Sequence, residues 1–272
     1  MNAERRLAVA GGRGFIGGEV MRRAAAAGWI VTLISHQDDV RDQHFESLIY
    51  CSGVAWGADE RAADAWDAHV VAPQRLLANN HIDRVVYVSS TRVYDGAAST
   101  NEAAALTIGR VDIPDVYRVS KIAGEAVLLS MHENATVARL SNVYGPSFTS
   151  GLFLSDVLRQ AGKMGRAHIR SALTSAKDYV SVGDVADTLL QLAALENAGT
   201  IFNVAAGRNI QHAEIAAILE REGIPVTTGD AAENIAMPID VSRLRGLLDW
   251  SPRSLTDDLP ALIAQFREHL RS

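Results

Sequence analysis

The sequence predicts an α/β fold, built on a doubly wound parallel sheet with a smaller C-terminal lobe. Short apolar runs alternate with helical patterns through the first half of the chain, which is typical of βαβ units. Runs such as RVVYVSS are apolar on both faces, as strands covered by helices on each side must be. After Gly145-Pro146 the pattern becomes less regular. We therefore expect a first domain at 1–145 and a smaller lobe at 146–272, partly interleaved with it.

The first elements follow from apolar runs and the glycines that end them. Leu7 to Ala10 is expected to form the first strand, because its apolar run turns at once into glycines. A helix is expected from Phe15 to Ala27, ending at Gly28, since glycine is common just after a helix. The next apolar runs predict strands at 29–34 and 47–51.

A long helix is then expected from Asp59 to Asn79, bent or interrupted near Pro73, because proline cannot continue the backbone ladder. Val85 to Ser89 reads as a buried strand, Tyr117 to Met131 as a helix, and Thr136 to Leu140 as a strand. Beyond residue 146, helical patterns lie near 152–161, 182–195, 212–222 and 257–270.

Composition excludes several classes of partner. Lysines and arginines number 26 and acidic residues 32, so the net charge is −6, and a nucleic-acid-binding surface would normally carry a basic excess. The one cysteine, Cys51, cannot form an intrachain disulfide, which fits a reducing compartment. No run approaches the roughly 18 apolar residues of a membrane span. We expect a cytoplasmic protein without a membrane partner, and no metal site, because the histidines show no spacing such as HExxH.

The run GGRGFIG follows the first strand and opens the first helix. Glycines here permit a tight turn and let the backbone approach a pyrophosphate, which then lies at the positive end of the helix dipole. Gly12-x-Gly14-x-x-Gly17 fits the general dinucleotide fingerprint of a Rossmann-type fold, although such a turn also joins strands and helices that bind nothing. The cofactor-binding candidates in this turn are Gly11, Arg13, Gly14, Phe15, Ile16 and Gly17.

The end of the second strand bears on the choice between NAD and NADP(H). An acidic residue there binds the ribose 2′-hydroxyl and repels a 2′-phosphate, but the expected position holds the uncharged Ser35. With His36 beside it and Arg13 in the glycine turn, Ser35 would accommodate a phosphate, which favours NADP(H). The alternative is that Asp38 or Asp39 folds back to the ribose.

A Tyr-x-x-x-Lys pair and a serine are the candidate catalytic residues. Tyr117 and Lys121 are four residues apart, so on a helix they share one face. A lysine near a phenol favours the phenolate, so we expect the pKa of Tyr117 to fall toward working pH and make it a general acid or base. Ser90 follows a central strand, at the sheet edge where ligands bind, and can bond a substrate oxygen. Ser89 and Thr91 are its rivals.

These motifs, in this order, resemble the extended short-chain dehydrogenase/reductases, specifically the NAD(P)-dependent epimerase/dehydratase group that acts on nucleotide sugars. The resemblance covers nearly the whole chain, and includes GGRGFIG (also in the spacing Gly11-x-x-Gly14-x-x-Gly17), VYVSSTRVYDG, YRVSK, RLSNVYGP, KDYVSVGDVAD, IFNVAAG and IDVSRLRGLLDWSP. It implies an NAD(P)-binding Rossmann domain at 1–145 and a substrate-binding lobe at 146–272.

The resemblance also assigns roles. It implies that Tyr117 is the acid/base, that Lys121 holds the nicotinamide ribose and tunes Tyr117, and that Ser90 orients the substrate. Relatives pair through two long helices, which here match 59–79 and 117–131, so a homodimer is expected. Further residues implied in cofactor binding are Ser52 and Gly53, and those implied in substrate binding are Thr91, Asn142 and Lys177.

Several positions depart from the family pattern. The 4,6-dehydratases carry an Asp-Glu pair directly after the catalytic hydroxyl residue, whereas this chain has Thr91 and Arg92, which argues against dehydration. His69 stands where the family usually has Asn, which suggests either a satisfied, partly buried histidine or an altered substrate pocket. Lys177 stands where family members often have an Arg that binds the pyrophosphate. A lysine carries a point charge and cannot form the bidentate hydrogen bonds of a guanidinium.

The resulting hypothesis is an NAD(P)-dependent oxidoreductase or epimerase acting on a nucleotide-activated sugar. Reduction of a 4-keto group is favoured over 4-epimerisation, because Ser35 and Arg13 suggest exchangeable NADP(H). The alternatives are an NADPH-dependent reductase of another small carbonyl compound and a non-catalytic dinucleotide-binding sensor.

Overall fold

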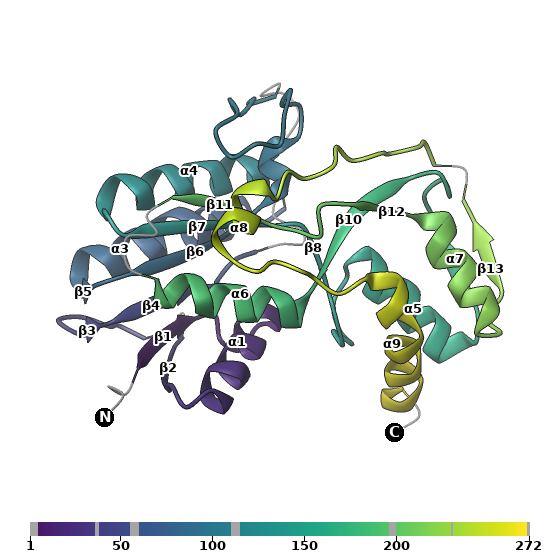
Figure 1. Cartoon of the computed structure of the whole chain (residues 1–272), viewed down its shortest axis with the longest axis horizontal. Helices are drawn as coiled ribbons and strands as arrows, with labels where there is room; N and C mark the ends of the chain where they lie inside the picture. The colour runs from purple at the N-terminus through teal and green to yellow at the C-terminus, as the bar shows by residue number, and fades with distance from the viewer. Residues whose placement is uncertain are drawn as a thin grey trace. The chain divides into compact units, whose positions relative to one another are not determined.

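The computed structural model describes residues 5–35, 38–54, 60–109, 115–195, 200–229 and 231–270. The chain divides into two compact units (Figure 1). The first comprises Met1–Leu140 and Val185–Val204, and the second comprises Ser141–Asp184 and Ala205–Ser272. The first unit therefore ends its first segment at Leu140, where the sequence analysis expects a division at 145/146, and it also takes in residues 185–204. Among the helices of the described ranges, none has the length and hydropathy that a membrane crossing requires.

The first unit is built on a six-stranded sheet with the order β11-β7-β6-β4-β1-β2. Every pairing in this sheet is parallel, as the α/β prediction requires. The chain passes from β1 to β2 on one side and then returns to place β4 on the other side of β1. The strands are β1 (Arg6–Ala10), β2 (Ile30–Ile34), β4 (Ser47–Tyr50), β6 (Val85–Ser90), β7 (Ala135–Leu140) and β11 (Ile201–Val204).

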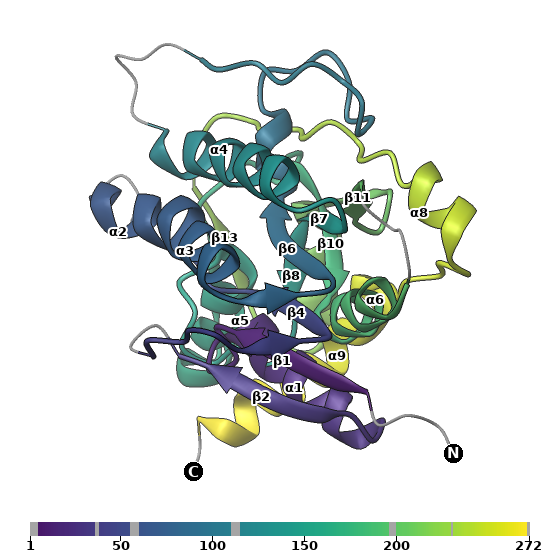
Figure 2. The same ribbon diagram turned by 90° about the vertical axis from the view of Figure 1, so that its left-hand side faces the viewer.

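Helices cover both faces of this sheet, which confirms the predicted Rossmann-type class. Figure 2 shows α1 (Phe15–Ala26) and α6 (Val182–Ala194) on one face, and α2 (Ala62–Trp66), α3 (Ala72–Asn79) and α4 (Val116–Met131) on the other. Both faces of the central strands are therefore buried, and all six residues of β7 are inaccessible to solvent.

The long helix expected at 59–79 is interrupted where it nears Pro73. A π-helical turn, η1 (Asp67–Val71), separates α2 from α3 just before Pro73, which lacks the N–H that would bond to the preceding turn. The Ala68 and His69 carbonyls of that turn accept the Tyr50 and Tyr87 hydroxyls. The expected start at Asp59 lies outside the described residues. Two strands of two residues each, β3 (His44–Phe45) and β5 (His81–Ile82), form a small parallel sheet that the apolar pattern did not predict.

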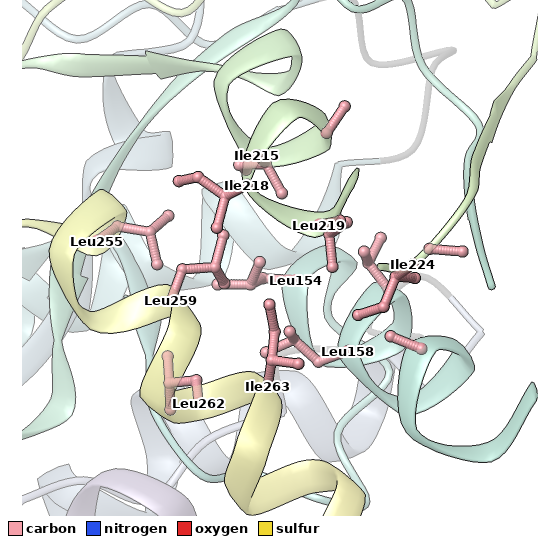
Figure 3. Close-up of a cluster of buried hydrophobic side chains, with 14 of the residues drawn as sticks. Leu154, Leu158, Ile215, Ile218, Leu219, Ile224, Leu255, Leu259, Leu262 and Ile263 are labelled. Carbon is pink, nitrogen blue, oxygen red and sulfur yellow. The ribbon is translucent and has the colours of Figure 1, made fainter. Parts of the chain in front are cut away.

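The second unit has short strands and four helices. Its sheets have the orders β12-β10-β8 and β13-β9, built from β8 (Asn142–Tyr144), β9 (Ala167–Ile169), β10 (Ala176–Ser181), β12 (Asn209–Gln211) and β13 (Val226–Thr228). The helices are α5 (Phe153–Met164), α7 (His212–Arg221), α8 (Ser242–Leu247) and α9 (Leu255–His269), of which α8 was not predicted. Apolar side chains of α5, α7 and α9 meet in one buried cluster, which includes Leu154, Leu158, Ile215, Leu219, Leu259 and Ile263 (Figure 3).

A buried ion pair joins α4 to the sheet of the first unit. Arg139 on β7 reaches Glu125 on α4 with Nη2 to Oε2 at 2.6 Å and Nε to Oε1 at 3.0 Å, and the two side chains are only 3% and 4% exposed. Ser89 donates its hydroxyl to the same carboxylate. Arg139 also donates to the Tyr94 hydroxyl, which donates in turn to Asn203 on β11. The pair is thus part of a network that links α4 to three strands.

Replacing Glu125 by Gln should strongly destabilise the protein. The substitution keeps the shape of the side chain but leaves the Arg139 guanidinium buried without a counter-charge, which costs about 3 to 5 kcal/mol. Urea unfolding at pH 7 measures the change. Asp39→Asn is the control, because the Asp39–Arg41 pair is exposed and should contribute less than about 1 kcal/mol. Equal, small effects of the two substitutions would show that the buried pair does not hold α4.

Candidate active site

The glycine turn packs directly against the loop after β4. Gly11 has φ +79°, and a Cβ atom there would lie 2.7 Å from the backbone nitrogen of Ser52, so the turn needs a glycine at this position. A Cβ atom on Gly17 would collide with the Gly11 carbonyl. The loops after β1 and β4 therefore meet where the strand order reverses, which is where open α/β sheets bind ligands.

Helix α1 begins beside this meeting point with no side-chain cap. Its N-cap residue is Gly14, and no acidic residue lies in its first turn, which includes Phe15, Ile16 and Gly17. The first N–H groups of a helix have no acceptor within the helix. They and the positive end of the helix dipole are therefore suited to a phosphate group.

A pocket opens at the carboxyl ends of β1, β2 and β4. Ser35 and Ser52, two of the residues expected to bind cofactor, both contribute to its wall, whereas Arg13 is exposed in the glycine turn and is not among the described lining residues. His36 lies outside the described residues. The pocket is lined by Ala10, Ile34, Ser35, Asp38, Asp39, Val40, Tyr50, Ser52, Ala68, Ala72, Arg75, Leu76 and Asn79.

Asp38 is held next to Ser35. Its carboxylate accepts the Ser35 backbone N–H at 2.7 Å, and the Ser35 carbonyl accepts the Asp38 N–H at 3.1 Å. The carboxylate of Asp39 instead pairs with Arg41 at 2.7 Å. Arg75 contributes the positive charge of the pocket wall from α3. The close glycine turn, the uncapped helix and this pocket together fit a dinucleotide.

Ser90, Arg92 and Tyr117 come together at the carboxyl end of β6. Ser90 ends the strand and accepts the Arg92 backbone N–H at 3.2 Å, and its side chain lies close enough to Tyr117 to act on the pKa of the phenol. Thr91 begins the short 3₁₀ helix η2 (Thr91–Tyr94), which carries the Arg92 guanidinium to 5.1 Å from the centre of the Tyr117 ring. Ser89 points elsewhere, because it binds the buried Glu125.

The expected fall in the pKa of Tyr117 is wrong for this structure. Burial raises the pKa of the phenol above 10, and the opposing influences are the Ser90 side chain and the charge of Arg92. Lys121 is turned toward the strand instead, since its Nζ donates to the Val88 carbonyl at 2.9 Å. Burial lowers the pKa of Lys121 to about 8, against the charge of Glu125, which raises it.

His69 joins the loop after β4 to the helix that carries Tyr117. The ring is fully buried, and burial together with the charge of Lys121 lowers its pKa from 6.5 to about 3. Nε2 accepts the Val54 N–H at 3.1 Å, so the neutral ring carries its proton on Nδ1 and donates it to Ser120 Oγ at 2.8 Å. Ser120 donates to the Tyr117 carbonyl at 3.1 Å.

These bonds use both ring nitrogens of His69, which agrees with the satisfied, buried histidine of the sequence analysis. Gly53 lies beside the ring, because a Cβ atom on Gly53 would be 2.9 Å from His69 Nε2 and 3.5 Å from Lys121 Nζ. Of the residues expected to bind cofactor after β4, Gly53 therefore lies beside the ring that contacts the helix of Tyr117 and Lys121.

The two other substrate candidates belong to the second unit. Asn142 begins β8 and donates its side-chain amide to the Asp178 carbonyl at 2.8 Å. Lys177 lies on the neighbouring strand β10, and its charge contributes to the lowered pKa of His212. The Asp178 carboxylate accepts backbone N–H groups of residues 206, 207 and 208, at 2.9, 2.7 and 3.1 Å, and so holds the loop after β11 against β10.

Sequence reasoning missed two cationic residues of the first unit. Arg75 lies on the pocket wall with Ala68, Ala72 and Asn79, a spacing of four, three and four residues that marks one helical face. The two alanines on the helical face that carries Arg75 were the available signal. The position of Arg92 over the Tyr117 ring had no signal, because it depends on the geometry of η2.

A family model described as the NAD dependent epimerase/dehydratase family matches residues 7–205. A dTDP-4-dehydrorhamnose reductase of Mycobacterium tuberculosis is 29% identical over 214 residues, which are 74% of this chain and 69% of the relative. A dTDP-6-deoxy-L-talose 4-dehydrogenase (NAD(P)(+)) of Kitasatospora kifunensis is 23% identical, over 92% of each chain.

The solved structure of MoeE5 in complex with UDP-glucose and NAD has the same fold. Its TM-score is 0.83, its sequence identity is 21%, and the match covers 97% of this chain and 99% of the other.

The buried, neutral His69 predicts an acid-sensitive fold. Below pH 6.5 the imidazole of His69 binds a proton in the unfolded chain, whereas in the folded chain it stays neutral until the pH nears 3. The free energy of unfolding therefore falls as the pH falls. From pH 7.5 to pH 5 this amounts to about 2 kcal/mol. His69→Asn should remove that part of the loss, as measured by urea unfolding at both pH values.

His168→Asn is the matched control, because His168 is exposed in the second unit. It should lose as much stability on acidification as the unaltered chain. The account fails if His69→Asn does the same.

Proposed function

The chain belongs to the NAD dependent epimerase/dehydratase family, and we propose that it is an NAD(P)-dependent oxidoreductase that reduces the 4-keto group of a nucleotide-activated sugar. The observation that carries the proposal is the placement of the Ser90 side chain close to the Tyr117 phenol, with the Arg92 guanidinium 5.1 Å from the ring centre. It supplies a hydroxyl pair and a cation at the edge of the sheet where the glycine turn lies. The activities named for the Mycobacterium and Kitasatospora relatives support this class of substrate.

Tyr117 is the proposed general acid. Its raised pKa keeps the phenol protonated near neutral pH, which is the state needed to donate a proton to a carbonyl oxygen. Ser90 binds the same carbonyl oxygen and holds it beside the phenol. When Tyr117 gives up its proton, Arg92 faces the ring that acquires negative charge and stabilises it. The reduced nicotinamide cofactor, when bound, supplies the hydride.

Lys121 is the proposed ribose-binding residue. An ammonium group has three donors, and the Val88 carbonyl accepts one of them, so two are available for sugar hydroxyls. With a pKa of about 8, the group is charged at neutral pH. The loop at Ser52 and Gly53 and the turn at Gly11 are the proposed neighbours of the cofactor.

Thr91 and Arg92 distinguish this activity from 4,6-dehydration. Dehydration needs an acid for the leaving hydroxyl and a base for the neighbouring proton. A guanidinium remains charged in proteins and serves as neither, and a threonine hydroxyl is a poor substitute for a carboxyl group. Epimerisation at C4 needs the same Tyr117 but a retained cofactor. Mass spectrometry of the purified chain therefore separates the two, since tightly held NAD would favour an epimerase.

We propose Asn142, Lys177 and Thr91 as substrate contacts, and the sugar and nucleotide they bind are part of the same proposal. A reductase of another small carbonyl compound is the second candidate, because Lys177 cannot form the bidentate hydrogen bonds to a pyrophosphate that an arginine at this position would form.

A homodimer is proposed from exposed apolar side chains on α2, η1 and α4, namely Trp66, Val71, Leu129 and Met131. Light scattering tests this proposal. A cytoplasmic location stays a prediction.

NADP(H) is the proposed cofactor, with Arg75 as the residue that favours it. Ser35 leaves room for a 2′-phosphate, and Arg75 on the same pocket wall offers a guanidinium to it. The Asp38 carboxylate opposes a phosphate, so the preference is the balance of these two charges.

Tyr117→Phe should lower kcat/KM for reduction of dTDP-4-dehydrorhamnose by roughly 10² to 10⁴, because the proton donor is lost. Cofactor affinity should change little. NADPH oxidation measures the rate, and fluorescence titration measures the affinity. Tyr179→Phe is the control, since it removes a buried hydroxyl of the second unit that has no hydrogen-bond partner among the described residues. A Tyr117→Phe rate within a few-fold of the unaltered rate would reject the acid.

Arg75→Gln should weaken NADPH binding roughly tenfold while leaving NADH binding nearly unchanged, because only NADPH carries the 2′-phosphate. Asp38→Asn should have the opposite effect and strengthen NADPH binding. Equilibrium titration of the three proteins with both cofactors measures this. NADH bound at least tenfold more tightly than NADPH by the unaltered chain would overturn the NADP(H) preference.

A further inference from the structure

Two histidines and an aspartate gather on the small sheet formed by β3 and β5 in the first unit. The parallel register pairs His44 with His81, and cross-strand partners project from the same face of a sheet. Asp83 follows His81 by two residues and so returns to that face. On the opposite face, Phe45 and Ile82 pack into the apolar core. The alternation of the strands thus presents three metal-binding side chains to solvent.

The Asp83 carboxylate lies between the two imidazoles, at distances close to those between ligands of one ion. Asp83 Oδ1 lies 3.0 Å from His44 Nε2 and 3.3 Å from His81 Nε2, and the three ligand atoms all lie within 4.8 Å of one another. Metal–ligand bonds of about 2.0 to 2.2 Å at tetrahedral angles separate neighbouring ligand atoms by roughly 3.3 to 3.6 Å. Small rotations would therefore complete a site, with water filling the open positions.

The backbone beneath these ligands is held from several sides. The Ile82 carbonyl is bonded to the His132 ring at 2.7 Å, and the Asp83 N–H donates to the Phe45 carbonyl at 3.0 Å. Asn80 accepts the Gln43 N–H at 3.1 Å and donates to the Val40 carbonyl. The ligands are exposed, at 56% for His44, 77% for His81 and 38% for Asp83, but the strands that carry them are fixed. A fixed frame lowers the cost of ordering a site.

We propose that His44, His81 and Asp83 form a surface site for a divalent transition-metal ion such as Zn²⁺. Two imidazoles and one carboxylate suit zinc, copper, nickel or cobalt, whereas magnesium and calcium take oxygen ligands. The ion would tie β3 to β5, two strands too short to be stable through their own pairing. This site is separate from Ser90 and Tyr117, so it does not depend on the proposed reaction.

The competing interpretation is a hydrogen-bonded cluster without an ion. In that case each neutral imidazole donates to Asp83, and the geometry needs nothing further. A metal site predicts that the metal-free chain binds added Zn²⁺ at these three residues, whereas a hydrogen-bonded cluster without an ion does not.

Calorimetric titration of the full chain, free of any affinity tag and dialysed against a chelator, distinguishes them. We expect one Zn²⁺ per chain, a higher unfolding temperature with Zn²⁺, and no comparable binding of Mg²⁺. His44→Ala, His81→Ala and Asp83→Asn should each weaken Zn²⁺ binding at least tenfold. His168→Ala removes an exposed histidine of the second unit and should leave the affinity unchanged. Circular dichroism of each metal-free variant verifies that it is folded.

A spectroscopic probe tests the ligands in the unaltered chain. Electron paramagnetic resonance with one equivalent of Cu²⁺ should show coupling to two imidazole nitrogens, and His81→Ala should reduce this to one. The site is rejected if Zn²⁺ binds no more tightly to the unaltered chain than to His81→Ala, or if His168→Ala weakens binding equally.

Discussion

The buried ion pair between Glu125 and Arg139 is the interaction on which the active-site side of the first unit depends. It fixes α4 to β7, and Ser89 attaches the same carboxylate to β6. Lys121 lies one helical turn before Glu125, and Tyr117 lies one turn before Lys121, so the orientation of the pair sets the position of both. A buried pair of this kind is costly to desolvate, and it is retained here where it aligns a helix with the strand that carries Ser90.

The topology of the parallel sheet brings the other residues of the candidate site to one edge. The glycine turn, Ser35, Ser52 and Ser90 follow four different strands, yet all lie at the carboxyl edge. His69 then connects this edge to α4 through bonds that reach Val54 on one side and Ser120 on the other. Its neutral ring serves as a donor and an acceptor at once, which a protonated ring cannot do.

The βαβ pattern of the first unit was predictable because its strands are apolar on both faces and its helices end at recognisable residues. The short strands were not, since β3 and β5 have two residues each and gain their pairing from tertiary contacts. His44 and His81 are far apart in sequence, so a search for local metal motifs passes over them. The structure brings Gly11 against Ser52 and Ser90 close to Tyr117, and the roles expected for these residues stay predictions.

Electrostatic detail was the least predictable feature of the site. The lowered pKa expected for Tyr117 assumed that a lysine four residues away acts on the phenol. Lys121 binds the Val88 carbonyl instead, and burial dominates the titration of the ring. The charge beside Ser35 was left open between two alternatives, and the structure places the Asp38 carboxylate there, as an acceptor for the Ser35 N–H.

The return of residues 185–204 to the first unit has a consequence for biosynthesis. Strand β11 covers the outer edge of β7, and its last residue is Val204, whereas β7 ends at Leu140. On a ribosome adding about 5 to 20 residues per second, β7 would wait roughly 3 to 13 s for its partner. For that interval the outer edge of β7, a strand that is buried along its whole length in the folded unit, presents unpaired backbone groups, and such an edge can pair with other chains. The nascent polypeptide is therefore most vulnerable to misassociation in the middle of translation, after most of its cofactor half has emerged.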